Sequence, residues 1–164
     1  MRARRTFQFD VIDEDQQTIT LEGRLQDPFH HITVGLVLEK RGLRIVLATG
    51  SMDRVPYPLG CPRSLCALDR VKGLEIRPGF VRSLRSALSG ELGCPYLVEL
   101  TEGICRFALV VIKSDEARQI AATGDDERFA LLRNEMGECA GHTLAKAHQL
   151  PDWLEREMKD KSRD

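Results

Sequence analysis

The chain has 164 residues and a mass of 18.5 kDa, and its 24 basic and 25 acidic residues give a formal net charge of -1. This balance gives no reason to expect a nucleic-acid or membrane-surface partner, and no apolar run approaches the ~20 residues of a membrane-spanning helix. The basic start MRARR is not followed by the apolar core of a signal peptide, so we expect a cytoplasmic protein with five reduced cysteines. A protein partner is possible, and the sequence does not indicate the oligomeric state.

The first third of the chain predicts β-strands. Apolar residues alternate with polar ones in four stretches, TFQFDVI, TITLEGRL, ITVGLVL and LRIVLATG. Alternation with period two is typical of strands with one buried face. A hairpin turn is expected at 39–42, with Gly42 available for a positive φ. We therefore predict an antiparallel sheet of three or four strands.

Helical patterns follow. Pro62 begins one at PRSLCALDRVKG, and PGFVRSLRSALSG and PYLVELTEGICRFALVVI give two more with apolar residues on one face. Short helices are expected in the charged remainder at SDEARQIAA, DDERFALLRNEM and PDWLEREMKD. Strands followed by helices indicate an α+β fold. We expect a single α+β domain over residues 1–112, and a charged helical extension over 113–164 that packs on it or follows it.

The tetrapeptide LGCP occurs twice and places Cys61 and Cys94 before a proline. Because proline suits the first position of a helix, each cysteine is expected as the N-cap, where the positive end of the helix favours thiolate over thiol. The alternative is that both are small buried residues at tight turns. If the two sulfurs converge, they form a site.

The other three cysteines lie in different sequence environments. Cys66 and Cys105 are expected in the core, since the first points away from Cys61 on a helix and the second lies beside an apolar stripe. Cys139 lies in GECAGH, three residues before His142, which is half of a zinc motif. His30 should share a buried strand face with Ile32, which leaves its neighbour His31 on the other face.

Several motifs occur in order over residues 20 to 112: EGRLQD, a His opening the next strand, a C-P segment, GLEIRPGF and GCPYL. In this order they resemble the uncharacterised bacterial domain-of-unknown-function family 2889. The resemblance places His30, Cys61 and Cys94 at the family's strand-opening His, its C-P cysteine and its G-C cysteine. Tyr96 stands where the family has a His after the G-C cysteine.

The resemblance extends less closely to the C-terminal part, where Cys139 followed by Pro151 and Trp153 is similar to the family's Cys and P-x-W segment. The order of sheet, cysteine and second cysteine is also similar to the NifU/IscU iron–sulfur scaffold fold. That similarity concerns the fold and does not determine function.

Three functions are compatible with these residues. The first is a small metal-binding accessory or scaffold-like protein, with Zn or an iron–sulfur cluster held by His30, Cys61, Cys94 and Cys139, and with Tyr96 supporting a ligand through a hydrogen bond. The second is a thiol-dependent enzyme with Cys94 or Cys61 as nucleophile and His30 as general base. The third is a non-catalytic interaction module.

Overall fold

A four-stranded antiparallel sheet forms the N-terminal half of the chain. The computed structural model describes residues 2–123 and 128, and the chain divides into two compact units, Met1–Ile112 and Lys113–Asp164. The strands follow the chain in the order β1-β2-β3-β4. Their bounds are Thr6–Glu14, Thr18–Gln26, His31–Glu39 and Arg44–Arg54. The predicted antiparallel sheet is therefore confirmed, with four strands.

Strands β2 and β3 provide the sheet side of the hydrophobic core. Their burial alternates residue by residue, as the period-two pattern predicted. The inward face of both strands is fully apolar apart from Gly23 and comprises Ile19, Leu21, Leu25, Ile32, Val34, Leu36 and Leu38. Burial of these side chains is the main free-energy source for folding the unit.

Strand β4 departs from the predicted alternation. The register against β3 shifts after the pair Leu38↔Ile45, so that Val37 faces Leu47 and Val46 is the extra residue of a bulge. A bulge inverts the faces of the residues that follow it. Ile45 is buried as expected, but Leu47 is 49% exposed, and Ala48 takes the inward position instead.

The turn before β4 also differs from the prediction. Leu43, and not Gly42, has the positive φ, at 48°. The carbonyl of Leu43 accepts a 2.8 Å hydrogen bond from the N–H of Ile76, which fixes this backbone position. The turn is therefore held by a distant segment that local sequence signals do not include.

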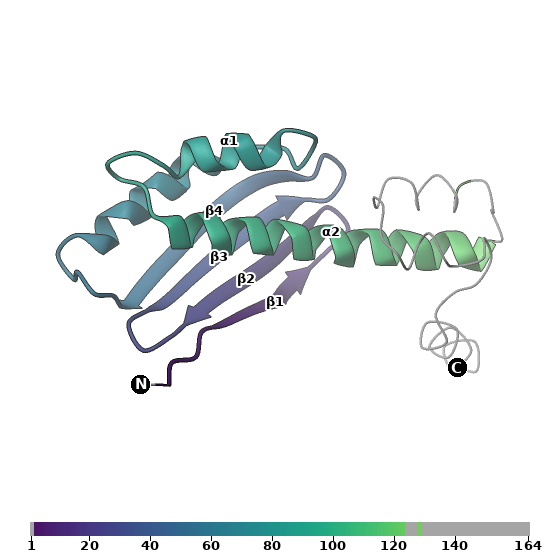
Figure 1. Cartoon of the computed structure of the whole chain (residues 1–164). Helices are drawn as coiled ribbons and strands as arrows, with labels where there is room; N and C mark the ends of the chain where they lie inside the picture. The colour runs from purple at the N-terminus through teal and green to yellow at the C-terminus, as the bar shows by residue number, and fades with distance from the viewer. Residues whose placement is uncertain (1, 124–127, 129–164) are drawn as a thin grey trace. The chain divides into compact units, whose positions relative to one another are not determined.

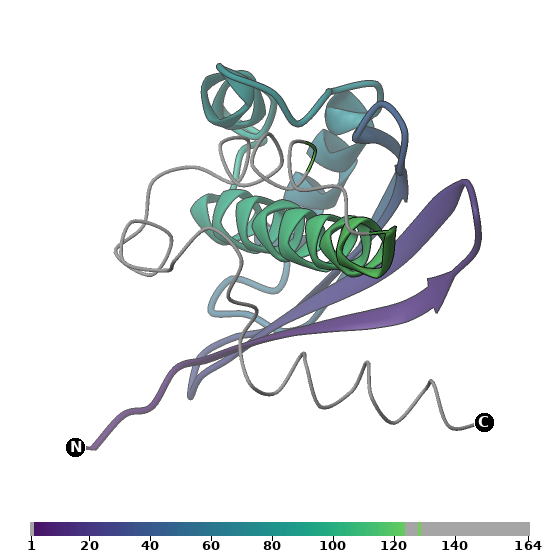
Figure 2. The same cartoon turned by 90° about the vertical axis from the view of Figure 1, so that its right-hand side faces the viewer.

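Three helices cover one face of the sheet. They are η1 (Cys61–Val71), α1 (Phe80–Ala87) and the part of α2 (Pro95–Thr123) that belongs to the first unit. All three lie on the same side of the strands in two perpendicular views (Figures 1 and 2). Among the expected inward residues of α1 and of the predicted 95–112 helix, Phe80, Leu84, Leu97, Leu100 and Ile104 are buried, and Val111 is half-buried. These elements and the sheet make the predicted α+β fold.

Two helix predictions need correction. The first helix, η1, is a 3₁₀-helix rather than an α-helix, and it begins at Cys61 itself with Gly60 as the cap. The stretch 114–122 is part of α2 rather than a separate short helix, because no Gly or Pro separates it from the residues before it. The helices predicted at DDERFALLRNEM and PDWLEREMKD lie outside the described residues, apart from position 128.

Close contact between α2 and the sheet depends on two glycines around one aromatic ring. A Cβ atom at Gly103 would lie 2.3 Å from Cζ of Phe9, and one at Gly23 would lie 2.8 Å from Cγ1 of Ile104. Gly103 therefore has a packing role that its poor helix propensity does not reveal. In the described part of the chain, no helix is both long and apolar enough to cross a bilayer.

Candidate functional site

A cleft of about 710 Å³ lies where four elements meet. The start of β3, the end of β4 and the first residues of η1 and α2 all contribute to its wall. Its lining residues are His30, Ile32, Met52, Val55, Pro56, Tyr57, Gly60, Cys61, Arg63, Ser64, Glu91, Leu92, Gly93, Cys94, Pro95 and Tyr96. Pockets for small-molecule ligands are typically of 300–1,000 Å³, so this volume suits such a ligand.

His30 lines the cleft and is held in a fixed orientation. Its Nδ1 atom lies 3.0 Å from Oδ1 and 3.2 Å from Oδ2 of Asp27. The side chain is 10% exposed, on the face that also carries Ile32. With Nδ1 occupied by a carboxylate, Nε2 is the ring nitrogen left for the cleft, because an imidazole has only two.

His31 has the opposite environment, as the alternation predicted. Its side chain is 37% exposed, and Nδ1 lies 3.5 Å from the exposed carboxylate of Asp53. Its Cα pairs with Gln26 and Arg54 across the sheet rather than with a lining residue. The two adjacent histidines therefore occupy different faces.

Asp27 is buried and ionised. Burial by itself would raise the pKa of this carboxyl, but hydrogen bonds from the Phe29 N–H, the Arg5 guanidinium and both the side chain and N–H of His30 outweigh it and hold the pKa well below its usual range. Arg5 donates from Nη2 at 2.6 Å and from Nε at 2.8 Å to Oδ2. The carboxylate thus orders both the turn before β3 and the histidine ring.

Tyr96 joins this network from the first turn of α2. Its ring centroid lies 4.4 Å from that of His30, and the Arg5 guanidinium lies 4.8 Å over the ring. Its hydroxyl accepts a 3.3 Å hydrogen bond from Arg5 Nη2. Within the described residues the Tyr96 hydroxyl is thus hydrogen-bonded to Arg5 and not to His30, Cys61 or Cys94.

Cys94 immediately precedes α2, as predicted. Its carbonyl accepts the 3.2 Å hydrogen bond from the Val98 N–H that closes the first turn. In the described part of the chain, the N–H groups of Tyr96 and Leu97 have no hydrogen-bond acceptor. Cys94 therefore stands at the N-terminal, positive end of a long helix, beside backbone N–H groups that face away from the helix body.

The remaining cysteines divide by environment. Cys61 lines the same cleft as Cys94, so the structure brings the two LGCP cysteines to one site. Cys105 is in the core as predicted, and burial, together with the nearby charge of Glu102, raises the pKa of its thiol to about 12. The prediction for Cys66 was wrong, because this residue lies on the solvent side of η1.

The predicted metal set is only partly within the described residues. His30, Cys61 and Cys94 line one cleft, whereas Cys139 lies outside residues 2–123 and 128. Within those residues, no three His, Cys, Asp or Glu side chains are grouped closely enough to hold a metal ion. The donors fit a thiophilic metal in chemical type but do not form a ready three-ligand centre.

Sequence reasoning missed two residues of the site. Asp27 could have been found, because D-x-x-H with Pro28 between is the spacing at which an aspartate side chain accepts from the N–H groups two and three residues on. Arg5 carried no such signal. Its contacts with Asp27 and Tyr96 join residues 22 and 91 positions away, and only the folded sheet brings them together.

The comparison with protein families matches residues 3–109 to DUF2889, a protein family of unknown function. The chain belongs to the DUF2889 family. The match covers β1 to β4, η1, α1 and the part of α2 that packs on the sheet, and therefore every lining residue of the cleft. The searches of curated proteins and of solved structures found no match. The similarity to the NifU/IscU fold thus has no support from solved structures.

Proposed function

We propose that this DUF2889 protein is a thiol-dependent enzyme that acts on a small molecule in the cleft, with Cys94 as nucleophile and His30 as general base. The observation that carries the proposal is the Asp27–His30 pair, with Nδ1 held at 3.0 Å, in a cleft that Cys94 also lines. A cysteine, an imidazole and a carboxylate that orients it are the parts of a nucleophilic site.

The chemistry follows from these groups. The Sγ–H proton of Cys94 passes to Nε2 of His30, and the thiolate attacks an electrophilic carbon of the substrate. A C–S bond forms as the bond to the leaving group breaks, and the leaving group takes the proton from His30. The N–H groups of the first turn of α2 would stabilise negative charge that develops on the substrate.

A second candidate is binding of Zn or an iron–sulfur cluster, with His30, Cys61 and Cys94 as ligands and Cys139 as a possible fourth. One observation favours it, because metal-ligating histidines commonly donate their second nitrogen to a carboxylate, as His30 does to Asp27. We rank it second because the three ligands within residues 2–123 and 128 are not grouped closely enough to hold a metal ion by themselves.

Selective alkylation of anaerobically purified protein, followed by peptide mapping, separates the two candidates. Thiol chemistry requires Cys94 to react with iodoacetamide faster than the exposed Cys66, while metal content stays far below one equivalent. Metal near one equivalent that is lost in Cys61→Ser and Cys94→Ser, but kept in Cys66→Ser, would establish the second candidate. If Cys94 reacts no faster than Cys66 and no metal is present, both are excluded.

A further inference from the structure

The apolar character of the cleft and its mouth indicates what kind of molecule it accepts. Ile32, Met52 and Val55 lie on the sheet side of the lining, and all three are partly or fully buried against the core. Leu92 and Tyr57 continue the apolar lining but are exposed, at 37% and 72%. The cleft thus offers an apolar surface that runs from the core out to solvent.

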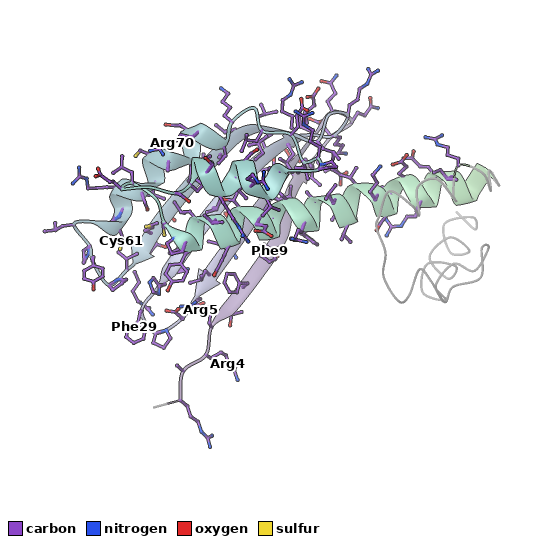
Figure 3. The ribbon with its side chains drawn as sticks, turned by 45° about the horizontal axis from the view of Figure 1, so that its top comes forward. Arg4, Arg5, Phe9, Phe29, Cys61 and Arg70 are labelled. Atoms are coloured by element: carbon purple, nitrogen blue, oxygen red, sulfur yellow. The ribbon has the colours of Figure 1, made fainter. Side chains whose placement is uncertain are left out.

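Two further exposed apolar residues lie close in the sequence to residues that line the cleft. Leu59, between the lining residues Tyr57 and Gly60, is 95% exposed, and Phe29, next to His30, is 55% exposed. Figure 3 shows Phe29 and Cys61 toward the same end of the domain, where α2 begins. Large apolar side chains gathered at a cleft mark a surface that binds an apolar group.

The lining of the cleft also includes a positively charged residue, Arg63. The side chain of Arg63 is exposed, and its guanidinium makes no hydrogen bond or ion pair with the part of the chain that is described. Arg54 lies beside Val55 and donates a long 3.4 Å hydrogen bond to the Asp27 carbonyl. Glu91 also lines the cleft and has no cationic partner among these residues, so it should oppose an anion there.

From this combination we infer that the ligand of the cleft is an amphipathic anion, with an apolar chain or ring against Ile32, Met52 and Tyr57 and a carboxylate or phosphate near Arg63. The inference rests on the proposed function, since it names the substrate class of the same cleft. The inference concerns only binding of the ligand, however, and does not depend on whether Cys94 acts as a nucleophile. A protein partner that covers the mouth would use the same apolar residues but would not require a small anion.

Calorimetric titration of the full chain carrying Cys94→Ser tests the inference without chemistry. The ligands are hexanoate, octanoate and decanoate, with decanol for the apolar part alone and decyl phosphate for the other anionic head. We expect affinity to rise about fourfold per added methylene. Decanoate or decyl phosphate should bind more tightly than decanol, and the tighter of the two identifies the head group.

Matched variants locate the binding. Arg63→Gln should lower the affinity for decanoate at least threefold and leave the affinity for decanol unchanged. Arg82 is an exposed arginine on α1, and Arg82→Gln should change neither affinity. Leu59→Ala should lower the affinity for every alkyl ligand. Val110 is also exposed, and Val110→Ala should leave these affinities unchanged. Glu91→Gln should raise the affinity for decanoate, because it removes a negative charge from the cleft lining.

No binding of any chain, or equal loss in the Arg63 and Arg82 variants, would overturn the inference. Binding of decanoate together with slow alkylation of Cys94 in the native protein would overturn the proposed enzyme and leave the ligand class intact.

Discussion

The Nδ1 atom of His30 lies 3.0 Å from Oδ1 of Asp27, and both side chains are almost entirely buried at the turn that joins β2 to β3. The same carboxylate accepts from Arg5 and from two backbone N–H groups, so one buried charge orders the turn, the N-terminal segment and the imidazole. The site is therefore built on a short, tightly hydrogen-bonded turn between two central strands of the sheet.

Replacing Asp27 should affect stability and reactivity together. In Asp27→Asn the charged hydrogen bond with Arg5 is lost. The native carboxylate can only accept hydrogen bonds and so fixes the orientation of the His30 ring, whereas an amide can both donate and accept. We expect a loss of about 2 kcal/mol in the free energy of unfolding, measured with urea. Arg77→Gln, whose ion pair with Glu75 is exposed, is the control and should change stability by less than about 0.5 kcal/mol. An equal change in the two variants would contradict a structural role for the Asp27 network.

The same carboxylate should make stability depend on acid pH. Because the folded pKa of Asp27 lies below the unfolded value of about 3.9, the folded state binds fewer protons than the unfolded state in this range. Its contribution is present above about pH 4 and is lost as pH falls from there towards the folded pKa. The stability difference between wild type and Asp27→Asn, followed by urea unfolding from pH 6 to pH 3, should shrink towards the acid end. A difference that grows on acidification would have the wrong sign.

Gly103 should tolerate no side chain even though it lies inside a helix. Alanine has the better helix propensity by about 1 kcal/mol, but its Cβ would lie 2.3 Å from the Phe9 ring. We expect Gly103→Ala to destabilise the protein by about 1–3 kcal/mol through overpacking. Phe9→Leu should rescue part of this loss in the double variant, because the two residues share one space. Simple additivity in urea unfolding would show that the close contact is not the cause.

The bulge in β4 should separate two apolar residues that share an alternation in the sequence. Ile45 is fully buried and Leu47 is 49% exposed. Ile45→Ala should therefore cost about 2–4 kcal/mol of unfolding free energy, and Leu47→Ala less than about 1 kcal/mol. Equal losses in thermal or urea unfolding would mean that the register continues without the bulge.

These contrasts show what local sequence determines and what it does not. The burial of β2 and β3 follows from period two because both strands are central in the sheet and each has one covered face. The positive φ of Leu43 and the glycine at 103 are linked to contacts with segments distant in sequence, and the bulge at Val46 is an irregularity in strand pairing that interrupts the alternation. Periodicity contains no information about such contacts.

The site divides in the same way. The proline after each LGCP cysteine marked a helix start, and both cysteines line the cleft, although a 3₁₀-helix at Cys61 begins one residue earlier than expected. The alternation that begins with His30 correctly predicted its buried face. Arg5 could not be found, because its role arises only when β1 pairs with β2 and brings its N-terminal end to Asp27.

The rate at which iodoacetamide alkylates Cys94 in His30→Gln at pH 7, compared with wild type, tests the central claim most directly. If His30 accepts the Cys94 proton, the rate should fall about tenfold or more, whereas His31→Gln, on the opposite face, should match wild type. Alkylation of Cys66 within the same samples controls for unfolding and should be unchanged. An unchanged Cys94 rate in a folded His30→Gln protein would contradict the account.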